Sequence, residues 1–562
     1  MDKQTVRYIL IAIVLFTGFS LFSKFQELQQ DKTNSKITDD YSKHETIIDG
    51  AGKEKRGRDQ KDIPGMVVPE VIKKHSPSVP GRELVIVETD VLKVKINSHG
   101  DLVFAELKKY PQSTKDHTKG VVLLEDDDNK FYIAQTGLLS ESGPDSKTHG
   151  RAKFAAKQHL YELDSQKQEL VVDLFYDYDS SGRGFDKNVN FIKRFKFNKN
   201  SYLVEVEYII QNNSKEEYKA SLYGRLRRLP EKVSSGFFSG GLRTYNGAAI
   251  STPNEKYKKI SFSNMKDPYK IAFTGGWIAM LEHYFVSAWI PKANSFSEYQ
   301  TEDFRDGSLG MRFVNAAVSV QPGATEKVSA QLFIGPKVAD VLKKISPSLE
   351  LTVDYGVLWW VCVPLFWLLR AIFNIIGNWG WAIIFTTLLI KILFYRLSAA
   401  SYRSMGNLRK LQPKIEELKA RCGEDRQRFS QSVMELYRKE KVNPLGGCLP
   451  ILVQIPVFIS LYYVLLESVE LRQAPWCLWI MDLSAKDPFY VLPVVMGISM
   501  FFQQKMNPPP PDPIQAKVLM FMPIFFTALF LQFPSGLMVY WVVNNTLSIL
   551  QQMYITRKVC GK

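Results

Sequence analysis

A single lysine interrupts a long apolar run in the second half of the chain. Between Trp381 and Phe394 the side chains are apolar except for two threonines and Lys391. A charge near the centre of a bilayer costs about 2.5 kcal/mol or more. A buried ammonium group can bind an anionic group or draw water into a cavity. The run therefore predicts a polar site inside a membrane.

Other polar side chains recur at helical spacing and could share a cavity with this lysine. Thr387 precedes Lys391 by four residues, so the two share one helix face. Further apolar segments contribute the polar candidates Gln454, Tyr540, Asn544 and Ser548. The predicted spans after residue 378 contain no Asp or Glu, so water and neutral polar groups must solvate the ammonium.

Snorkelling is the alternative explanation for Lys391. Leu397 lies six residues further on, about 9 Å at helical rise, and a lysine stem covers much of that distance. Asn and Gln in spans also serve as contacts between helices. We expect a functional cavity, because ionisable residues within membranes usually mark function.

Hydropathy and charge define the elements that must position these residues. The chain has 562 residues, a net charge of +15 and 45% hydrophobic residues, but only its second half carries long apolar segments. We predict these parts: 1–26, a signal-anchor transmembrane helix; 27–80, a flexible polar linker; 81–350, a β-rich, sandwich-like domain; 354–377, an interfacial amphipathic helix; 378–398, transmembrane helix 2; 399–443, a helical hairpin; and 444–562, transmembrane helices 3–6 with short loops and a basic tail.

The β-rich prediction rests on strand-like patterns. Residues 83–96 and 202–210 alternate, and 277–290 is rich in β-branched and aromatic residues. Glu282 and His283 could form an acid–base dyad, but neighbours on one strand point to opposite faces, so we expect a structural role. All seven histidines precede residue 284, and the five cysteines, all after residue 361, form no C-x-x-C pair. We therefore predict no enzyme, metal site or cofactor.

The basic segment 399–443 sets the predicted topology. Its excess of Lys and Arg belongs on the cytoplasmic side. Segment 355–376 is long enough to span, but Pro364 interrupts it, and a span there would move the basic segment outside. We place it on the outer surface. The prediction is a polytopic α-helical protein with six transmembrane helices, both termini inside and a large outer β domain.

The segment 399–443 also has a helical-hairpin pattern. Apolar residues keep coiled-coil-like spacing on both sides of a turn at Cys422-Gly423, and Pro413 should bend the first arm. Its basic side chains could contact a ribosome, although a solvated charged surface is an equal alternative. The candidate contacts are Arg409, Lys410, Lys414, Arg426 and Arg428.

Several stretches resemble one family closely. They are VNPLGGCLPILVQIPVFISLYYVL (442–465), ELRQAPWCLWIMDLSAKDPFYVLPVVMG (470–497), FPSGLMVYWVVNN (533–545), GNWGWAII (377–384) and GGWIAMLEHYFVSAWIP (275–291). The chain resembles the YidC membrane-protein insertases. Its N-terminal anchor and outer domain resemble the Gram-negative bacterial form.

The resemblance implies a function for the lysine. Members of the family have a cytoplasm-open hydrophilic groove with a basic residue, usually arginine, where this chain has Lys391. A lysine keeps the charge but loses the five-donor fork. Tyr540 and Trp541 match an aromatic pair beside a hydrophobic slide, and Asn545 ends the same motif, so both Trp541 and Asn545 join the predicted groove residues.

The expected function is a membrane-protein insertase and chaperone of the bacterial inner membrane, with its large domain in the periplasm. It would insert and help fold nascent inner-membrane proteins, alone or with the Sec translocon and a ribosome. No P-loop motif is present, so we expect no nucleotide, and no direct DNA binding. The alternatives are a small-solute (anion) transporter or channel, and an envelope protein whose helices only anchor it. The spans show no internal repeat, and a simple anchor needs only one span.

Overall fold

A computed structural model describes residues 83–127, 130–141, 143–146, 150–177, 188–230, 245–423, 425–440, 449–507 and 513–560. The predicted signal anchor (1–26) and linker (27–80) lie outside the described residues. The described residues divide into a small unit, residues 513–522, and a large unit that contains all the others.

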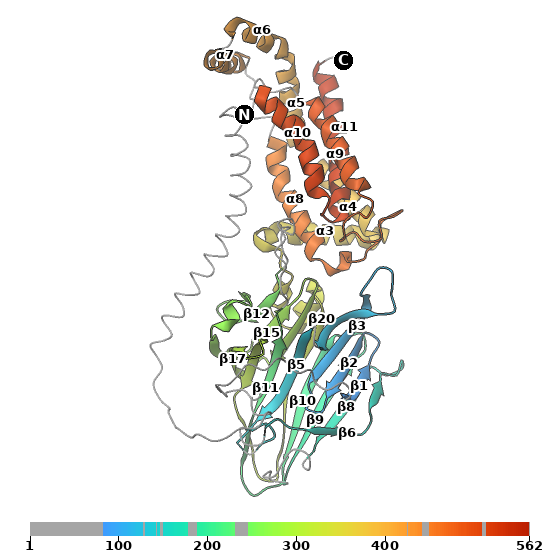
Figure 1. Cartoon of the computed structure of the whole chain (residues 1–562), viewed down its shortest axis with the longest axis vertical. Coiled ribbons are helices and arrows are strands. Elements are labelled where there is room, and N and C mark those ends of the chain that lie inside the picture. The colour runs from blue at the N-terminus through green and yellow to red at the C-terminus, as the bar shows by residue number, and fades with distance from the viewer. Residues whose placement is uncertain are drawn as a thin grey trace, which may run out of the picture. The chain divides into compact units, whose positions relative to one another are not determined.

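Two antiparallel sheets form the β domain in the described part of the chain (Figure 1). The first sheet has the order β14-β17-β18-β11-β5-β4-β3-β2-β1-β7, with β19 paired to β11 and β7 parallel to β1. Its strands are β1 (Glu83–Glu88), β2 (Leu92–Asn97), β3 (Leu102–Pro111), β4 (Gly120–Asp126), β5 (Phe131–Leu139), β7 (Leu160–Glu162), β11 (Tyr218–Arg228), β14 (Lys270–Thr274), β17 (Phe296–Asp303), β18 (Leu309–Asn315) and β19 (Val318–Val320).

The second sheet has the order β13-β12-β15-β16-β20-β10-β9-β8-β6. Its strands are β6 (Phe154–Ala156), β8 (Glu169–Tyr176), β9 (Val189–Asn198), β10 (Leu203–Asn212), β12 (Gly247–Ser251), β13 (Lys258–Ile260), β15 (Trp277–Leu281), β16 (Phe285–Pro291) and β20 (Thr325–Pro336). A short 3₁₀ helix, η3 (Asn264–Lys266), lies between β13 and β14.

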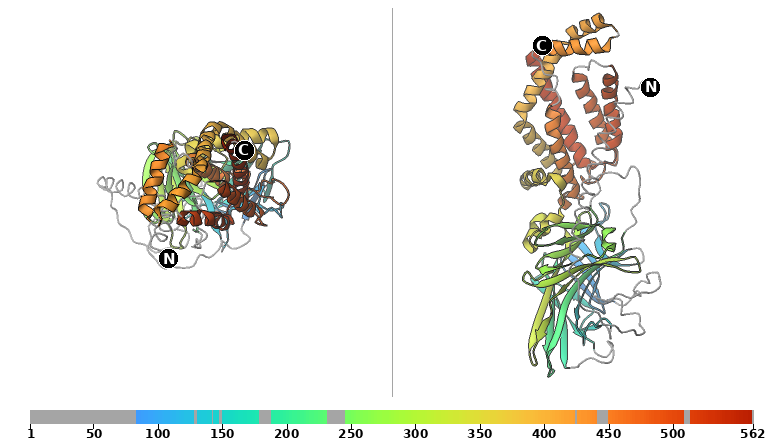
Figure 2. Two further views of the ribbon diagram at one scale, coloured as in Figure 1. Left: turned by 90° about the horizontal axis from the view of Figure 1, so that it is seen from above. Right: turned by 90° about the vertical axis from the view of Figure 1, so that its left-hand side faces the viewer.

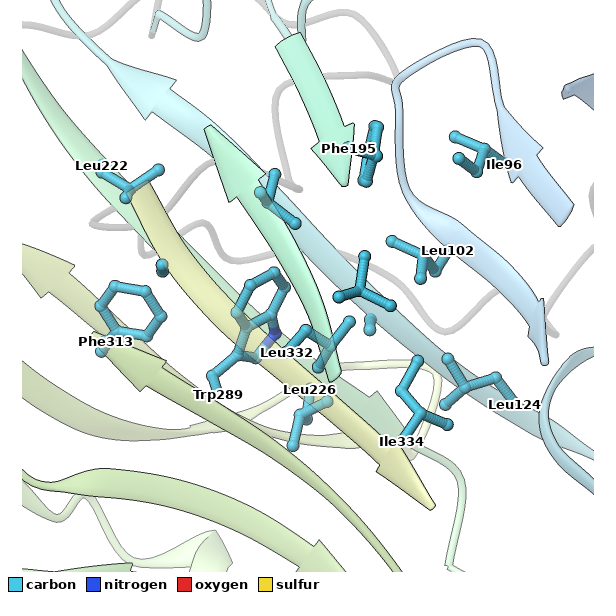
Figure 3. Packing of buried hydrophobic residues seen from close by; sticks show 14 of the residues in the cluster. Ile96, Leu102, Leu124, Phe195, Leu222, Leu226, Trp289, Phe313, Leu332 and Ile334 are labelled. Atoms are coloured by element: carbon cyan, nitrogen blue, oxygen red, sulfur yellow. The ribbon is translucent and has the colours of Figure 1, made fainter. Parts of the chain in front are cut away.

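Alternating side chains from both sheets fill the core of this sandwich. β2 alternates buried and half-buried positions along its whole length, as a strand with one core face should. Figure 3 shows Trp289 and Leu332 of the second sheet packed with Leu226 and Phe313 of the first. The strand pattern of the sequence therefore predicts the sandwich correctly.

Two expected strands are each divided by a turn. Residues 83–96 form β1 and β2, because the Thr89 hydroxyl accepts hydrogen bonds from the amides of Val91 (3.2 Å) and Leu92 (2.9 Å) and closes a turn between them. Residues 277–290 form β15 and β16, which pair with each other around a turn that holds Glu282 and His283. The opposite-face argument for this pair was therefore wrong, since neither residue lies on a strand.

Glu282 and His283 nevertheless have separate structural partners. The Glu282 carboxylate lies 3.1 Å from the Arg228 guanidinium. The His283 Nε2 atom donates a hydrogen bond of 2.7 Å to the carbonyl of Leu466. No acid–base dyad forms between the two described side chains.

The second half of the chain is helical. A short helix, α2 (Ala339–Ile345), and the 3₁₀ turns η4 (Leu349–Thr352) and η5 (Gly356–Leu358) connect it to β20. The long helices are α3 (Trp359–Ile376), α4 (Trp379–Leu393), α5 (Tyr395–Lys410), α6 (Gln412–Cys422), α7 (Arg426–Lys439), α8 (Leu449–Glu467), α9 (Val491–Met506), α10 (Pro513–Phe530) and α11 (Ser535–Cys560); η7 (Val469–Leu471) follows α8.

The first helices of this half differ from simple spans. Among the described residues, one continuous helix, Gly356–Ile376, is long and apolar enough to cross a membrane by itself. Figures 1 and 2 show that α3 runs across the direction of α8 and α11. The predicted transmembrane helix 2 is divided at Phe394, where α4 and α5 meet at a bend of 68°.

Helix α11 holds several helices together. It packs against α4 and α5 on one side and against α9 on another, and α3 packs against α4 and α8. The apolar stretches Gln454–Glu467 and Ala516–Phe530 are shorter than a full span by the same test of the described residues.

Helices α6 and α7 form an antiparallel pair beyond α5. Helix α6 begins at Gln412, directly before Pro413, and ends at Cys422, where Gly423 follows with a positive φ of 58° that glycine tolerates. Asp425 caps α7 by accepting hydrogen bonds from the amides of Gln427 (3.1 Å) and Arg428 (3.0 Å). Apolar side chains close the pair: Leu411, Ile415, Phe429, Val433, Leu436 and Tyr437.

Candidate functional site

Lys391 lies in the last turn of α4, just before the bend. Its ammonium donates a hydrogen bond of 2.7 Å to the Ser548 hydroxyl of α11 and one of 3.4 Å to the Gln454 side-chain carbonyl of α8. Both acceptors are neutral, and the Lys391 side chain stays partly exposed. The described contacts therefore leave the positive charge without a carboxylate partner.

The hydrogen bonds continue through Gln454. Its side-chain nitrogen donates to the Tyr540 hydroxyl at 2.5 Å, while the Ser548 hydroxyl donates to the backbone carbonyl of Asn544 at 2.7 Å. Residues from three helices, α4, α8 and α11, thus form one polar network around Lys391. The positions of these residues in the sequence predicted this convergence.

A small cavity adjoins this network. Its volume is about 10 Å³, and its lining consists of Ile390, Lys391, Phe394, Leu397, Ser398, Gln454 and Val457. One water molecule needs about 10–15 Å³ when volume is measured in this way. The space is therefore far smaller than the expected groove, and α5 supplies part of its wall.

Other predicted groove residues have different partners. The Thr387 hydroxyl is buried and donates to the Ile383 carbonyl of its own helix at 2.7 Å. The Asn545 side chain donates to the Ser499 hydroxyl of α9 at 2.9 Å, on another face of α11. Successive residues of a helix point about 100° apart, so Asn544 and Asn545 cannot both face Lys391.

Trp541 belongs to an aromatic cluster. Its ring centroid lies 4.5 Å from that of Phe458 on α8 and 4.9 Å from that of Phe530 on α10. Tyr540 is buried beside it, with only its hydroxyl in the polar network. Sequence reasoning missed Phe458 and Phe530, although Phe458 follows Gln454 by four residues and so shares its face.

The candidate hairpin contacts are mostly exposed. Arg409, Lys410 and Arg428 have exposed side chains, and the side chain of Arg426 lies outside the description. Lys414 forms a 2.6 Å ion pair with Glu440 just after α7. An exposed pair of this kind contributes about 0–1 kcal/mol, so Lys414 remains accessible to a stronger anionic partner.

No cluster of three or more metal-ligating side chains occurs among the described residues. Cys362, Cys422 and Cys477 are free thiols. The polar network around Lys391 is thus built of an ammonium, an amide and hydroxyls. Such a set can bind and orient an anionic or hydrogen-bonding group.

Two family models match the chain. Residues 84–368 match the YidC periplasmic domain, and residues 371–562 match the 60Kd inner membrane protein family. Together they cover both the β domain and the helical half.

Curated relatives match over nearly the whole chain. Membrane protein insertase YidC of Pseudomonas putida (strain W619) is 48% identical over 500 residues, covering 89% of this chain and 88% of that protein. The corresponding protein of Pseudomonas fluorescens (strain SBW25) is 49% identical over 486 residues, covering 86% and 85%. A crystal structure of an active YidC insertase with its first transmembrane domain resolved aligns with a TM-score of 0.37 at 18% identity, covering 84% of this chain and 94% of that one.

Proposed function

This chain belongs to the YidC family of membrane protein insertases, and we propose that Lys391 receives the hydrophilic flank of a nascent membrane protein during insertion. The protein is an insertase of the inner membrane with a periplasmic β domain. The groove, the topology and the partners below are the proposed details.

One observation carries this proposal: a partly exposed ammonium whose partners, among the described residues, are neutral acceptors from two other helices. The Lys391 ammonium already makes charge-assisted hydrogen bonds to neutral acceptors, but an anion would add a direct Coulomb attraction, which is strong where the dielectric is low. A carboxylate on a substrate tail can therefore replace Ser548 or Gln454 at the Lys391 ammonium with a net gain. An acid already paired to Lys391 would remove that gain.

The proposed topology has six transmembrane helices with both termini in the cytoplasm. The spans would be the N-terminal anchor, then α4 with the start of α5, α8, α9, α10 and α11. Helix α3 would lie on the periplasmic surface, and its course across α8 and α11 supports that placement. The basic pair α6–α7 would then face the cytoplasm, as the charge rule requires.

The groove must open before a tail can enter. The cavity beside Lys391 holds about one water molecule, and Phe394, Leu397 and Ser398 close it from the α5 side. The break at Phe394 would let α5 move as an element separate from α4, at the cost of its packing against α11. Each polar group left unbonded in hydrocarbon costs several kcal/mol. An open, hydrated groove would therefore shorten the distance that the polar tail must cross through hydrocarbon.

The apolar segment of the substrate would meet the lipid-facing side of α8 and α10. Ile455, Ile524 and Phe525 are exposed there, beside the cluster around Trp541. Burial of that segment in lipid supplies the driving force, and the membrane potential assists acidic tails. The Sec translocon and a ribosome are the proposed partners, with the exposed basic residues of the hairpin as the ribosome contact.

The decisive experiment measures insertion by proteoliposomes that contain only this protein. The substrate is a single-span protein with a short acidic tail, and protease protection scores tail translocation. Loss of one charge-assisted hydrogen bond is worth about 1.5–3 kcal/mol, so Lys391→Leu should lower translocation about tenfold or more. Lys391→Arg should retain it.

Two controls make the result specific. Lys505→Leu removes a lysine from α9 that stacks over Phe501 and should leave translocation unchanged. A substrate with a neutral tail should depend much less on Lys391. Equal translocation by wild type and Lys391→Leu would refute the proposed role of the charge.

A further inference from the structure

The connection between α8 and α9 exposes apolar side chains at its tip. Within residues 474–490, which we call the tip loop, Leu478 is 81% exposed, Met481 59% and Phe489 67%. Exposed large apolar side chains gathered within one short loop can form a contact surface. The stretch Cys477–Met481 carries no charged side chain.

The backbone of the tip loop holds these side chains outward in an unusual conformation. Leu478 has a φ of 54° and Tyr490 a φ of 56°. A bulky residue in this left-handed region is uncommon, and Gly or Asn is the ordinary choice. An apolar side chain is thus retained where the backbone alone would favour a glycine.

Several polar groups of the tip loop bond within the loop or to the start of α9. The amide of Trp476 donates to the Ile480 carbonyl at 3.0 Å, and the amide of Leu483 donates to the Ala474 carbonyl at 3.0 Å. The Asp487 carboxylate accepts bonds from the Trp479 indole (3.0 Å) and from the amides of Phe489 (3.0 Å) and Leu492 (2.7 Å). Internal bonding of this kind is what contact with lipid requires.

Contacts with the helices fix the base of the tip loop. The Trp476 ring covers Gly380 of α4 so closely that a Cβ there would lie 2.1 Å from it. The Asn378 side chain donates to the Trp476 carbonyl at 3.2 Å, and the Ser535 hydroxyl at the start of α11 donates to the Asp482 carbonyl at 2.8 Å. These contacts therefore hold the tip loop in a fixed position relative to α4 and α11.

The surroundings of the tip loop are those of a membrane interface. Its own Trp476 and Trp479 accompany Trp379 and Trp381 of α4, and the rings of Trp381 and Trp476 are 6.2 Å apart. Tryptophans concentrate at the headgroup level of bilayers. The exposed apolar surface also continues along α9 through Val494, Val495 and Ile498.

We propose that the tip loop inserts Leu478, Met481 and Phe489 among the lipid chains of the periplasmic leaflet. The internal hydrogen bonds of the backbone, the uncharged stretch 477–481 and the continuity with α9 favour lipid over a protein partner. This inference rests on the topology in the proposed function, which places the end of α8 at the periplasmic side. The loop then fixes the depth of α8 and α9 beside the Lys391 site.

Native Cys477 provides the test. In the full chain, Cys422, Cys448 and Cys560 are changed to Ser, buried Cys362 is kept, and an NBD fluorophore is attached to Cys477. The protein is reconstituted in phosphatidylethanolamine–phosphatidylglycerol liposomes containing lipids with a doxyl quencher on an acyl chain. A matched probe replaces Cys477 by Ser and labels Ser113→Cys, an exposed position of the β3–β4 connection.

The doxyl lipids should quench the Cys477 probe at least twofold more than the Ser113 probe, and aqueous iodide should do the reverse. Leu478→Asp with Met481→Asp should lower the doxyl quenching to the Ser113 level. Leu478→Gly, which suits the positive φ and so keeps the fold, should lower it partly. Iodide access equal to that of Ser113, or shielding from iodide without doxyl quenching, would overturn the inference in favour of water or a protein contact.

The insertion assay distinguishes this inference from the proposed function. Low doxyl quenching with normal insertion overturns only the lipid contact. Normal doxyl quenching with insertion that is insensitive to Lys391→Leu overturns only the role of the lysine.

Discussion

Asp101 forms a buried ion pair between the two sheets of the β domain. Its carboxylate receives both terminal nitrogens of the Arg151 guanidinium, and both side chains are buried. Burial alone would raise the pKa of Asp101, but Arg151, with smaller contributions from Lys193 and His99, more than offsets it, so the pKa lies below its ordinary value. The pair is therefore charged and depends on both members.

Replacing Asp101 should destabilise the β domain strongly. Asp101→Asn leaves Arg151 buried without its anion, which costs about 3–5 kcal/mol in the free energy of unfolding. Hydrogen exchange of the β-domain amides in the full chain measures this loss. Asp173→Asn is the matched control, because Asp173 and Arg194 form a similar but partly exposed pair that should contribute about 0–1 kcal/mol. Equal losses in both variants would contradict the argument.

Residue types and spacing predicted the centre of the candidate site but not its edges. Lys391, Gln454, Tyr540 and Ser548 converge because each is a polar residue that cannot face lipid without cost. Sequence does not reveal the rotation of each helix about its axis. For that reason it could not assign Asn545 to the α9 side.

At the scale of elements, Gly497 allows α9 and α10 to approach. A Cβ at Gly497 would lie 2.0 Å from the Thr527 hydroxyl oxygen, but 3.3 Å from the Thr527 Cβ. Gly497→Ala should therefore overpack this contact and cost about 1–3 kcal/mol, measured as a lower thermal midpoint in lipid nanodiscs. Adding Thr527→Ala removes the clashing oxygen and should restore much of the stability. A double variant no better than Gly497→Ala would show that the clash lies elsewhere.

The turn between β15 and β16 makes the contact with α8 sensitive to pH. Burial lowers the pKa of His283 from 6.5 to about 4, and Lys337 and Arg472 lower it further, while its bond to the Leu466 carbonyl raises it. The unfolded chain thus binds a proton below about pH 6.5, and the folded chain only below about pH 4. The stabilisation by neutral His283 is present above pH 6.5 and declines as the pH falls to 4.

The thermal midpoint of unfolding in nanodiscs should therefore fall between pH 7 and pH 4.5. The full lowering of the His283 pKa corresponds to about 3 kcal/mol in the free energy of unfolding. The expected effect is smaller, because His283 is only half-buried and solvent screens its charge. His283→Gln can still donate a side-chain bond toward Leu466 but does not titrate, so it should flatten the dependence. An unchanged slope in that variant would assign the effect to other groups.

Element boundaries were the part of the fold that sequence patterns located least well. The alternating pattern of 83–96 continues through the turn at Thr89, so periodicity alone gives no sign of it. In the same way, the apolar run 379–397 continues through the bend at Phe394. Local hydrogen bonds and tertiary packing decide such breaks, and the apolar pattern does not record them.

At the scale of the molecule, one ion pair joins residues far apart in the chain. Lys337, at the end of β20, contacts Glu467, at the end of α8, at 3.3 Å, and both side chains are buried. The sequence places them 130 positions apart, so no local pattern could have paired them. Removing one partner leaves the other charge buried.

A double-mutant cycle tests this connection. Lys337→Met and Glu467→Met should each lower the free energy of unfolding by about 3–5 kcal/mol, whereas the double variant should lie close to wild type. Denaturant unfolding in the same detergent measures all four proteins. Additive losses in the double variant would mean that the two side chains do not depend on each other.

The bend after Lys391 has a consequence for the way in which the site is built. Helix α4 ends at Leu393 and α5 begins at Tyr395, and the two meet at 68°. Lys391 lies on the α4 side of this joint, whereas Leu397 and Ser398 line the same cavity from the α5 side. The wall of the cavity is therefore divided between two elements that are joined at Phe394, and a rotation at this joint would change the size of the cavity without displacing the lysine.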